Sequence, residues 1–203
     1  MPILSDERRD ERRAQILDAA RACILESGLE AVSMEAIIAR SGLSTGAVYR
    51  YFDGKHEIVN VAVMTGTLAT AEALGRILGQ DPPPPMPELV GQMLKAVSAA
   101  GPRGDVDLAA VALHGWSHSR TDPELKDRLQ AVHRTLRNQC ARVCRRWQAT
   151  GELSPTADAT AIAQLMVSIT LGFIAQRAVA GNADVRAHVA ALTAIAGAPS
   201  VSA

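Results

Sequence analysis

Small and hydroxyl-bearing side chains gather in one short segment of the chain, from Ser44 to Ala47. Ser44 can cap a helix, and Thr45, Gly46 and Ala47 would then form a narrow first turn. The narrow end of a helix can approach base edges in the major groove of DNA, which is wide enough to admit it. There the Thr45 hydroxyl can hydrogen-bond a base edge, and the Ala47 methyl, if it points outward, can meet a thymine methyl. The segment therefore suits the reading of bases.

Cationic and hydroxyl groups close to this segment could bind the phosphates of DNA. Lys55 is predicted to begin the next helix, where its ammonium group and the free backbone N–H groups together favour a phosphate. Arg50 can reach a phosphate or a base edge, and the hydroxyls of Ser33 and Ser44 can donate to phosphate as well as cap helices. The alternative for Lys55 is an ordinary solvated lysine on the surface.

A charged segment precedes the first apolar stripe and contains four arginines: Arg8, Arg9, Arg12 and Arg13. Such a run can form an arm over the DNA backbone or minor groove. Its acidic neighbours reduce the net positive charge. An arginine run of this kind more often forms Glu–Arg pairs on a solvated helix face. Both interpretations stay open.

Helical periodicity positions all of these groups. The apolar pattern predicts a first helix over 8–27, ended by Gly28. Ser33 can cap a second helix, a break follows at 41–43, and Ser44 can cap a third, short helix. That helix would turn Ala47 and Val48 inward and Thr45, Tyr49 and Arg50 outward. Tyr51 and Phe52 are expected in the core. Two short helices around a tight turn with glycine are typical of a helix-turn-helix.

The rest of the chain keeps a helical period that prolines and glycines interrupt. A long helix is predicted from Lys55 to about Leu78, and a stiff, non-helical connector over 81–87. Further helices are predicted over 88–100, 106–119, 123–149, 156–180 and 184–196. No strand pattern and no βαβ alternation occurs, so the sequence predicts an all-α fold of about nine helices.

The segment Gly42–Lys55, GLSTGAVYRYFDGK, resembles the core of the TetR family. That family typically shows a first helix, a helix-turn-helix, a Tyr-x-Tyr/His-Phe segment and a lysine that opens the fourth helix, all present here in order over roughly residues 10–60. One departure is Ile38, where the family usually has a small residue at the crossing of the second and third helices. The resemblance implies that Thr45, Gly46 and Ala47 touch bases and that Tyr49 touches phosphate.

The resemblance also implies a ligand-responsive transcriptional regulator, most often a repressor. Residues 1–54 would form the DNA-binding helix-turn-helix domain, and residues 55–203 a ligand-binding and dimerisation domain. Dimerisation would use the apolar surface of about 156–196, and a homodimer predicts a near-palindromic operator on double-stranded DNA. A small molecule between helices would release the DNA. Candidate pocket residues, which can equally be plain core, are Met93, His114, Trp116, His118, His133, Cys140, Trp147, Met166, Phe173 and Gln176.

Bulk charge does not by itself indicate a nucleic-acid binder, because the formal net charge of the chain is zero. Residues 1–60 hold eight Lys and Arg against ten Asp and Glu, a net charge of −2. DNA binding must therefore depend on where the positive groups lie.

Cysteine usage and the chain's N-terminus bear on location. Three cysteines are no disulfide framework, so a reducing cytoplasm is expected. The charged N-terminal segment is no signal peptide, and no uncharged apolar stretch is expected to reach the length of a membrane span. His114 with His118, and Cys140 with Cys144, share an i,i+4 spacing that a metal or thiol sensor can use. Such pairs are common by chance, so no metal and no cofactor are predicted.

Other classes of protein explain the chain less well. No Gly-rich phosphate loop, paired carboxylates or nucleophile signature occurs, so the sequence predicts no enzyme. A helical enzyme that uses the histidines, or a pure protein-interaction module, would leave the pattern of residues 42–55 unexplained.

Overall fold

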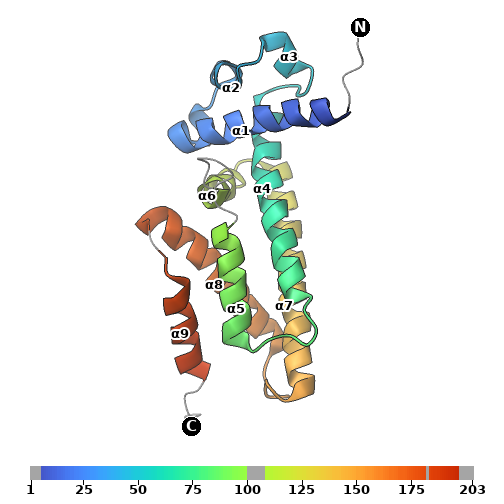
Figure 1. Cartoon of the computed structure of the whole chain (residues 1–203), viewed down its shortest axis with the longest axis vertical. Helices are drawn as coiled ribbons and strands as arrows, with labels where there is room; N and C mark the ends of the chain where they lie inside the picture. The colour runs from blue at the N-terminus through green and yellow to red at the C-terminus, as the bar shows by residue number, and fades with distance from the viewer. Residues whose placement is uncertain (1–5, 100–107, 182, 197–203) are drawn as a thin grey trace. The chain divides into compact units, whose positions relative to one another are not determined.

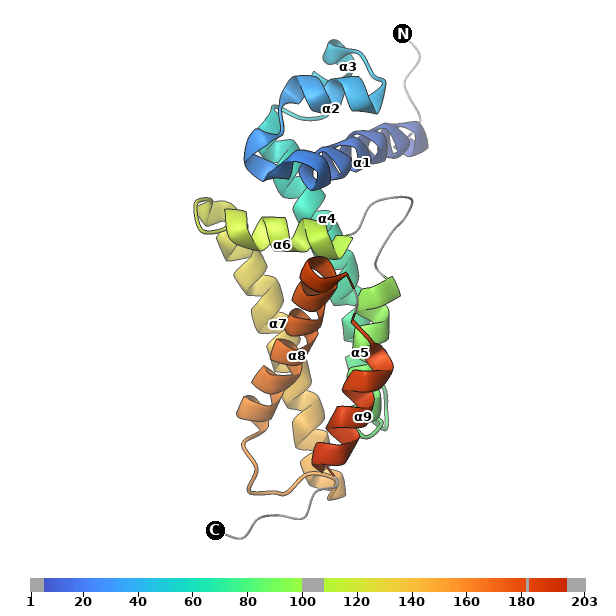
Figure 2. The ribbon, with the colours of Figure 1, turned by 90° about the vertical axis from the view of Figure 1, so that its left-hand side faces the viewer.

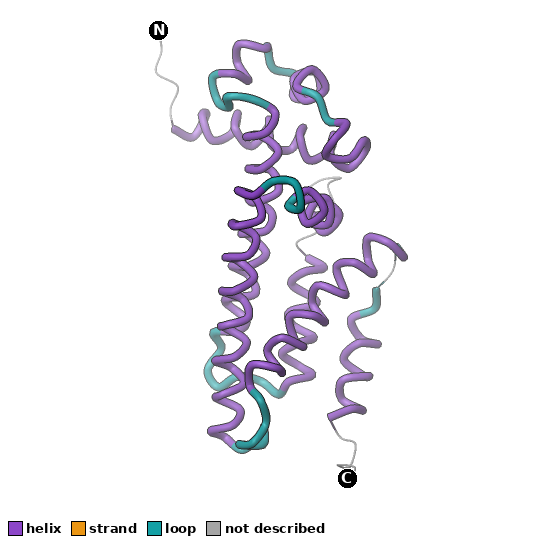
Figure 3. Tube along the Cα trace, turned by 180° about the vertical axis from the view of Figure 1, so that it is seen from behind, coloured by secondary structure: helices purple, strands orange, loops and turns teal. Residues whose placement is uncertain are grey.

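The computed structural model describes residues 6–99, 108–181 and 183–196. These residues form nine α-helices and no strand (Figure 3), which confirms the predicted all-α fold. In chain order the helices are α1 (Asp6–Ala31), α2 (Met34–Ser41), α3 (Thr45–Tyr49), α4 (Lys55–Leu78), α5 (Met86–Ala99), α6 (Leu108–His118), α7 (Pro123–Thr150), α8 (Ala159–Ala180) and α9 (Val185–Ala196) (Figure 1).

The chain divides into two compact units. The first comprises residues 1–68 and 101–129, and the second comprises residues 69–100 and 130–203. All residues predicted to touch DNA belong to the first unit. The functional boundary predicted near residue 54 is a different kind of division from this one, and it stays a prediction.

One hydrophobic cluster holds α1 to α4 together in the first unit. Ile16 and Ile24 of α1, Ile37 of α2, Val48 of α3 and Ile58 of α4 are all 0% exposed. Burying one such side chain contributes about 1.5–3 kcal/mol. Isolated helices below about 12 residues are unstable in water, so this packing, rather than helix propensity, keeps the short α2 and α3 folded.

Helix α6 belongs to the same unit and packs across α1 (Figure 1). It also approaches α4 closely at Gly115, where an added Cβ would lie 2.4 Å from Cγ1 of Val63. Only glycine permits this approach, which fixes the turn between α6 and α7 near the start of α4.

The first helix has a break at Gly28, where the sequence predicted its end. This glycine has φ 77° and ψ 160°, which is not helical, yet helical turns resume beyond it as far as Ala31. Leu29 and Val32 are buried, so hydrophobic packing holds the chain against the core after the break. The predicted end of the first regular helix at Gly28 is therefore confirmed, and a short second helical stretch follows as far as Ala31.

Replacing Gly28 with alanine should lower the free energy of unfolding by about 1–3 kcal/mol, because its φ and ψ lie in a region that is essentially open to glycine alone. Urea unfolding followed by circular dichroism measures this. Gly46→Ala is the matched control, since an added Cβ meets nothing within 4 Å at either site and only Gly28 has a positive φ. Equal midpoints for the two variants would contradict the prediction.

In the second unit, α5 packs along α9 and against α8 (Figure 2). At Gly91 of α5 an added Cβ would lie 2.6 Å from Cγ2 of Val189 in α9. Trp147, 2% exposed, donates its indole N–H to the Pro84 carbonyl at 3.1 Å and so fixes the proline-rich connector. That connector is shorter than predicted: α5 begins at Met86, and Pro87 sits in its first turn, where a missing N–H costs nothing.

Two helices, α4 and α8, are long and apolar enough to cross a membrane by length and composition. The expectation that no stretch reaches that length is wrong on this count, because residues 159–176 contain no charged side chain. The core helix of a globular protein passes the same test. Consistent with that role, α8 buries one face in its own unit, with Met166, Val167 and Phe173 all 0% exposed.

Candidate nucleic-acid interface

Two serines cap the helices of the predicted helix-turn-helix, as expected. Ser33 Oγ accepts the Ala36 N–H at 3.1 Å, and Ser44 Oγ accepts the Ala47 N–H at 3.3 Å. The Ser33 hydroxyl also hydrogen-bonds the Glu35 side chain, so its proton is already engaged within the protein. Between the helices Gly42 adopts φ 66°, a left-handed conformation that ends α2 and turns the chain into α3.

The short helix α3 has two distinct faces. Val48 is 0% exposed and, just beyond the helix, Phe52 is 1% exposed, so both anchor it in the core. Thr45 and Gly46 are exposed on the other face. Tyr49 is 49% exposed, so the predicted inward position of Val48 and the outward positions of Thr45 and Tyr49 are confirmed.

Three further residues of this region are partly buried. Ala47 and Tyr51 are partly buried rather than fully in or out. Ile38, the departure from the family pattern, is partly buried and packs against the same cluster. The larger side chain is therefore accommodated within the hydrophobic packing.

Lys55 begins α4, as predicted. It is half-buried, and its ammonium group lies 3.5 Å from the Glu30 carbonyl oxygen, a long hydrogen bond that leaves donors free. The Glu57 carboxylate already accepts the Asp53 N–H at 2.8 Å at this helix end. Lys55 thus lies at the helix start where the sequence placed it, and its contact with phosphate stays a prediction.

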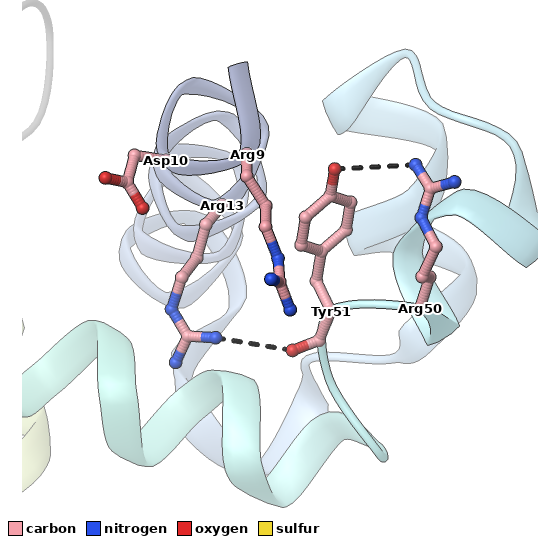
Figure 4. Close-up of a pocket in the computed structure, with 5 residues that line it drawn as sticks. All are labelled: Arg9, Asp10, Arg13, Arg50 and Tyr51. Atoms are coloured by element: carbon pink, nitrogen blue, oxygen red, sulfur yellow. Dashed lines mark hydrogen bonds between the residues drawn. The ribbon is translucent and has the colours of Figure 1, made fainter. Parts of the chain in front are cut away.

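The arginine run does not behave as one arm. Arg9 and Arg13 line a hollow of about 390 Å³ together with Asp10, Arg50 and Tyr51 (Figure 4). By contrast, Arg12 bonds to the Gln15 side chain at 2.8 Å on the exposed face. The i,i+4 spacing of Arg9 and Arg13 was the sequence signal that they share a face, but nothing in the sequence placed Arg50 opposite them.

A buried carboxylate joins the start of α4 to the turn before α7, all within the first unit. Asp122, 6% exposed, caps α7 through the Leu125 N–H at 3.0 Å. It also accepts from the Asn60 amide at 3.0 Å and lies 2.9 Å from His56 Nε2. His118 Nε2 is 4.0 Å away. The contact was not predicted, because His56 and Asp122 are 66 residues apart.

The environment of Asp122 favours its charged form. Burial acts in the opposite sense and would raise the pKa. Hydrogen bonds from the Leu125 N–H, Asn60 and His56 outweigh burial and hold the pKa of this carboxyl below its ordinary value. The residue next to Lys55 is thus tied to a stable anion in the turn between α6 and α7.

The predicted ligand-binding residues are divided between the two units. His114, Trp116 and His118 lie on α6 in the first unit. The second unit holds Met93, His133, Cys140, Trp147, Met166, Phe173 and Gln176. Most of the second group are buried core side chains. The ligand pocket therefore stays a prediction.

The cysteine pair is poorly suited to thiol chemistry. Burial raises the pKa of the Cys140 thiol to about 12 and that of Cys144 to about 11. Thiolates are the reactive and metal-binding form, so both residues behave as small apolar side chains. Within the described residues, no group of three or more His, Cys, Asp or Glu side chains is arranged to hold a metal ion.

Comparison with known proteins agrees with this geometry. The family model "Bacterial regulatory proteins, tetR family" matches residues 16–62, and "BetI-type transcriptional repressor, C-terminal" matches residues 86–196. The HTH-type transcriptional regulator BetI of Burkholderia thailandensis is 32% identical over 141 residues, which cover 66% of this chain and 68% of BetI. The HTH-type transcriptional regulator UidR of Escherichia coli K12 is 25% identical over 168 residues, 80% of each chain.

Among solved structures, Salmonella enterica GusR has the same fold, with a TM-score of 0.73 at 20% identity over 95% of this chain and 96% of GusR. The regulator FadR from Bacillus halodurans aligns with a TM-score of 0.72 at 15% identity, covering 92% of this chain and 95% of FadR. The chain belongs to the TetR family of bacterial transcriptional regulators, which are not enzymes, and it carries a helix-turn-helix DNA-binding domain and a BetI-type C-terminal domain.

Proposed function

We propose that the protein is a homodimeric repressor that binds a near-palindromic operator and releases it when a small molecule binds the C-terminal domain. The observation that carries the proposal is the two-faced helix α3, anchored by Val48 and Phe52 with Thr45, Gly46 and Tyr49 turned outward. A rigid helix with a small, exposed N-terminal face is what major-groove reading requires.

In this proposal Thr45, Gly46 and Ala47 contact base edges. The phosphate contacts come from Tyr49 and Lys55, and from the capping hydroxyls of Ser33 and Ser44. Arg50, exposed at the end of α3, reaches a phosphate or a base edge. Such a regulator works where the chromosome is, in the cytoplasm of the bacterial cell.

Dimerisation is supported by apolar surface on α8 and α9. Leu165 is 51% exposed, Val179 86% and Ile195 72%, and α9 has an apolar sequence with no buried residue. Covering this surface with a second copy would bury it in a two-fold interface. Two recognition helices would then meet successive major grooves about 34–36 Å or more apart.

Repression and ligand release are the finer parts of the proposal. The C-terminal family model is described as that of a BetI-type transcriptional repressor, which supports repression as the direction of control. The pocket is proposed to draw on Met93, His114, Trp116, His118, His133, Met166 and Phe173. If none of the metabolites handled by the products of the regulated genes changes the affinity for the operator, the proposal of ligand release is wrong.

The test is a fluorescence-anisotropy titration against the DNA that flanks the protein's own gene, at several salt concentrations. Lys55→Ala and Tyr49→Phe should each weaken specific binding about 5- to 10-fold, because each removes one phosphate contact. Lys55→Ala should also reduce the slope of log K against log salt by about 1.

Lys126→Ala is the matched control, since Lys126 is exposed on α7 in the same unit and lies outside the helix-turn-helix in the sequence. It should leave both affinity and salt slope unchanged. If Lys126→Ala weakens binding as much as Lys55→Ala does, the proposed phosphate contact is wrong. If the folded dimer binds none of the flanking DNA, selection from random duplexes decides whether it binds a specific sequence at all.

A further inference from the structure

Three guanidinium groups from two distant parts of the chain converge beside α3. Arg9 and Arg13 project from one face of α1. Arg50 is the residue that directly follows α3, and its side chain points toward Tyr51 (Figure 4). Tyr51 lies between them, and together with Asp10 these residues line the hollow of about 390 Å³. All of them belong to the first unit, so the arrangement is internal to one compact body.

Within the described residues, no ion pair engages Arg9, Arg13 or Arg50. Among the described residues, the ion pairs of arginine involve other residues, such as Arg21 with Asp18 and Arg40 with Glu26. The single carboxylate of the hollow, on Asp10, points away from Arg50 and Tyr51 in Figure 4. Three arginines against one acid leave a net positive site.

Two of the three guanidinium groups are held in place by aromatic rings. The Arg13 Cζ lies 4.4 Å from the centre of the buried Phe52 ring, and its Nη1 donates to the Tyr51 carbonyl at 3.4 Å. The Arg50 Cζ lies 5.3 Å from the Tyr51 ring centre, and its Nη2 donates to the Tyr51 hydroxyl at 3.4 Å. Stacking orients a guanidinium while leaving most of its five N–H donors free.

Oriented guanidinium groups with free N–H donors are well suited to binding a phosphate group. Arginine binds phosphate through paired N–H···O bonds, and stacked arginines lose less freedom when they do so. We propose that this hollow binds a phosphate group through Arg9, Arg13 and Arg50. The favoured source is a phosphodiester of bound DNA, because Arg50 directly follows the recognition helix; the other source is a free phosphate anion. The DNA source rests on the proposed function, whereas the phosphate site itself does not.

The experiment compares Arg9→Gln with Arg12→Gln. Both residues are exposed on α1, but only Arg9 lines the hollow, so the pair separates the site from the general charge of the helix. The full-length protein is titrated with operator and with unrelated duplex at several salt concentrations. In a second arm, inorganic phosphate is titrated into DNA-free protein at constant ionic strength, with binding followed by NMR of the arginine side chains. Arg50→Gln serves as a second variant of the site.

If the phosphate belongs to DNA, Arg9→Gln should weaken both duplexes about 5- to 10-fold and lower the salt slope by about 1, while Arg12→Gln changes neither. If the source is a free anion, inorganic phosphate should saturate the wild-type protein and fail to saturate Arg9→Gln, with unchanged DNA binding. Either result supports the site. Matching behaviour of Arg9→Gln and Arg12→Gln in both arms overturns it. Should the wild-type protein bind no DNA, the proposed function fails, and the phosphate arm alone decides the site.

Discussion

Replacing Gly46 with glutamate is expected to weaken specific operator binding by about 100-fold or more, because an unpaired carboxylate would face base edges and phosphates. The fold should not suffer. An added Cβ at Gly46 meets nothing within 4 Å, and the backbone there is helical. Glutamate favours helix more than glycine does, and the first turn of a helix favours an anion, so stability should hold or rise slightly.

The control for Gly46→Glu is Ala149→Glu, which adds the same charge at an exposed position near the end of α7. Anisotropy titration measures the affinity of both variants, and urea unfolding measures their stability. A Gly46→Glu protein that binds the operator as tightly as Ala149→Glu does would show that this face of α3 does not meet DNA.

Replacing Asp122 with alanine is expected to lower the free energy of unfolding by about 2–4 kcal/mol. The loss has two sources: the buried Leu125 N–H loses its cap, and the buried Asn60 amide loses its acceptor. Urea unfolding measures the change. Asp127→Ala removes an exposed carboxylate from the next turn of α7 and should be nearly neutral. Similar losses for the two variants would contradict the role assigned to Asp122.

The same carboxyl gives a pH dependence with a definite sign. Its pKa is lower in the folded protein than in the unfolded chain, where an aspartate titrates near about 4. Its contribution to stability is therefore complete above the unfolded-state value and is lost as pH falls through the folded-state value. The wild-type protein should lose more stability than Asp122→Asn between about pH 5 and pH 3. Parallel curves for the two proteins would show that the carboxyl does not gain from folding.

Local sequence patterns were enough to predict most of the helices and the faces that they bury. Helical periodicity predicted the elements, serine caps predicted where α2 and α3 begin, and the alternation around Val48 and Tyr49 predicted their faces. These features depend on neighbours within a few residues, so they are visible in sequence alone. The resumption of helix after Gly28 depends instead on tertiary burial of Leu29 and Val32, which no local pattern reveals.

The parts of the site that escaped prediction are those made by distant segments. Asp122 reaches His56 only because α6 and α4 come close at Gly115. The hollow of Arg9, Arg13 and Arg50 likewise requires the packing of α1 beside the turn after α3. Sequence could suggest that Arg9 and Arg13 share a face, but it could not separate a phosphate site from a solvated run of charge.

The five-residue helix α3 also has a consequence for how such a protein diverges. Its position depends on Val48 and Phe52 beneath it, whereas Thr45, Gly46 and Tyr49 face outward and contribute little to the core. A duplicated gene can therefore change the outward residues and acquire a new operator without compensating substitutions in the core. Because Tyr49 is assigned to a phosphate contact, which carries no sequence information, paralogues with different targets are expected to differ first at Thr45 and Gly46.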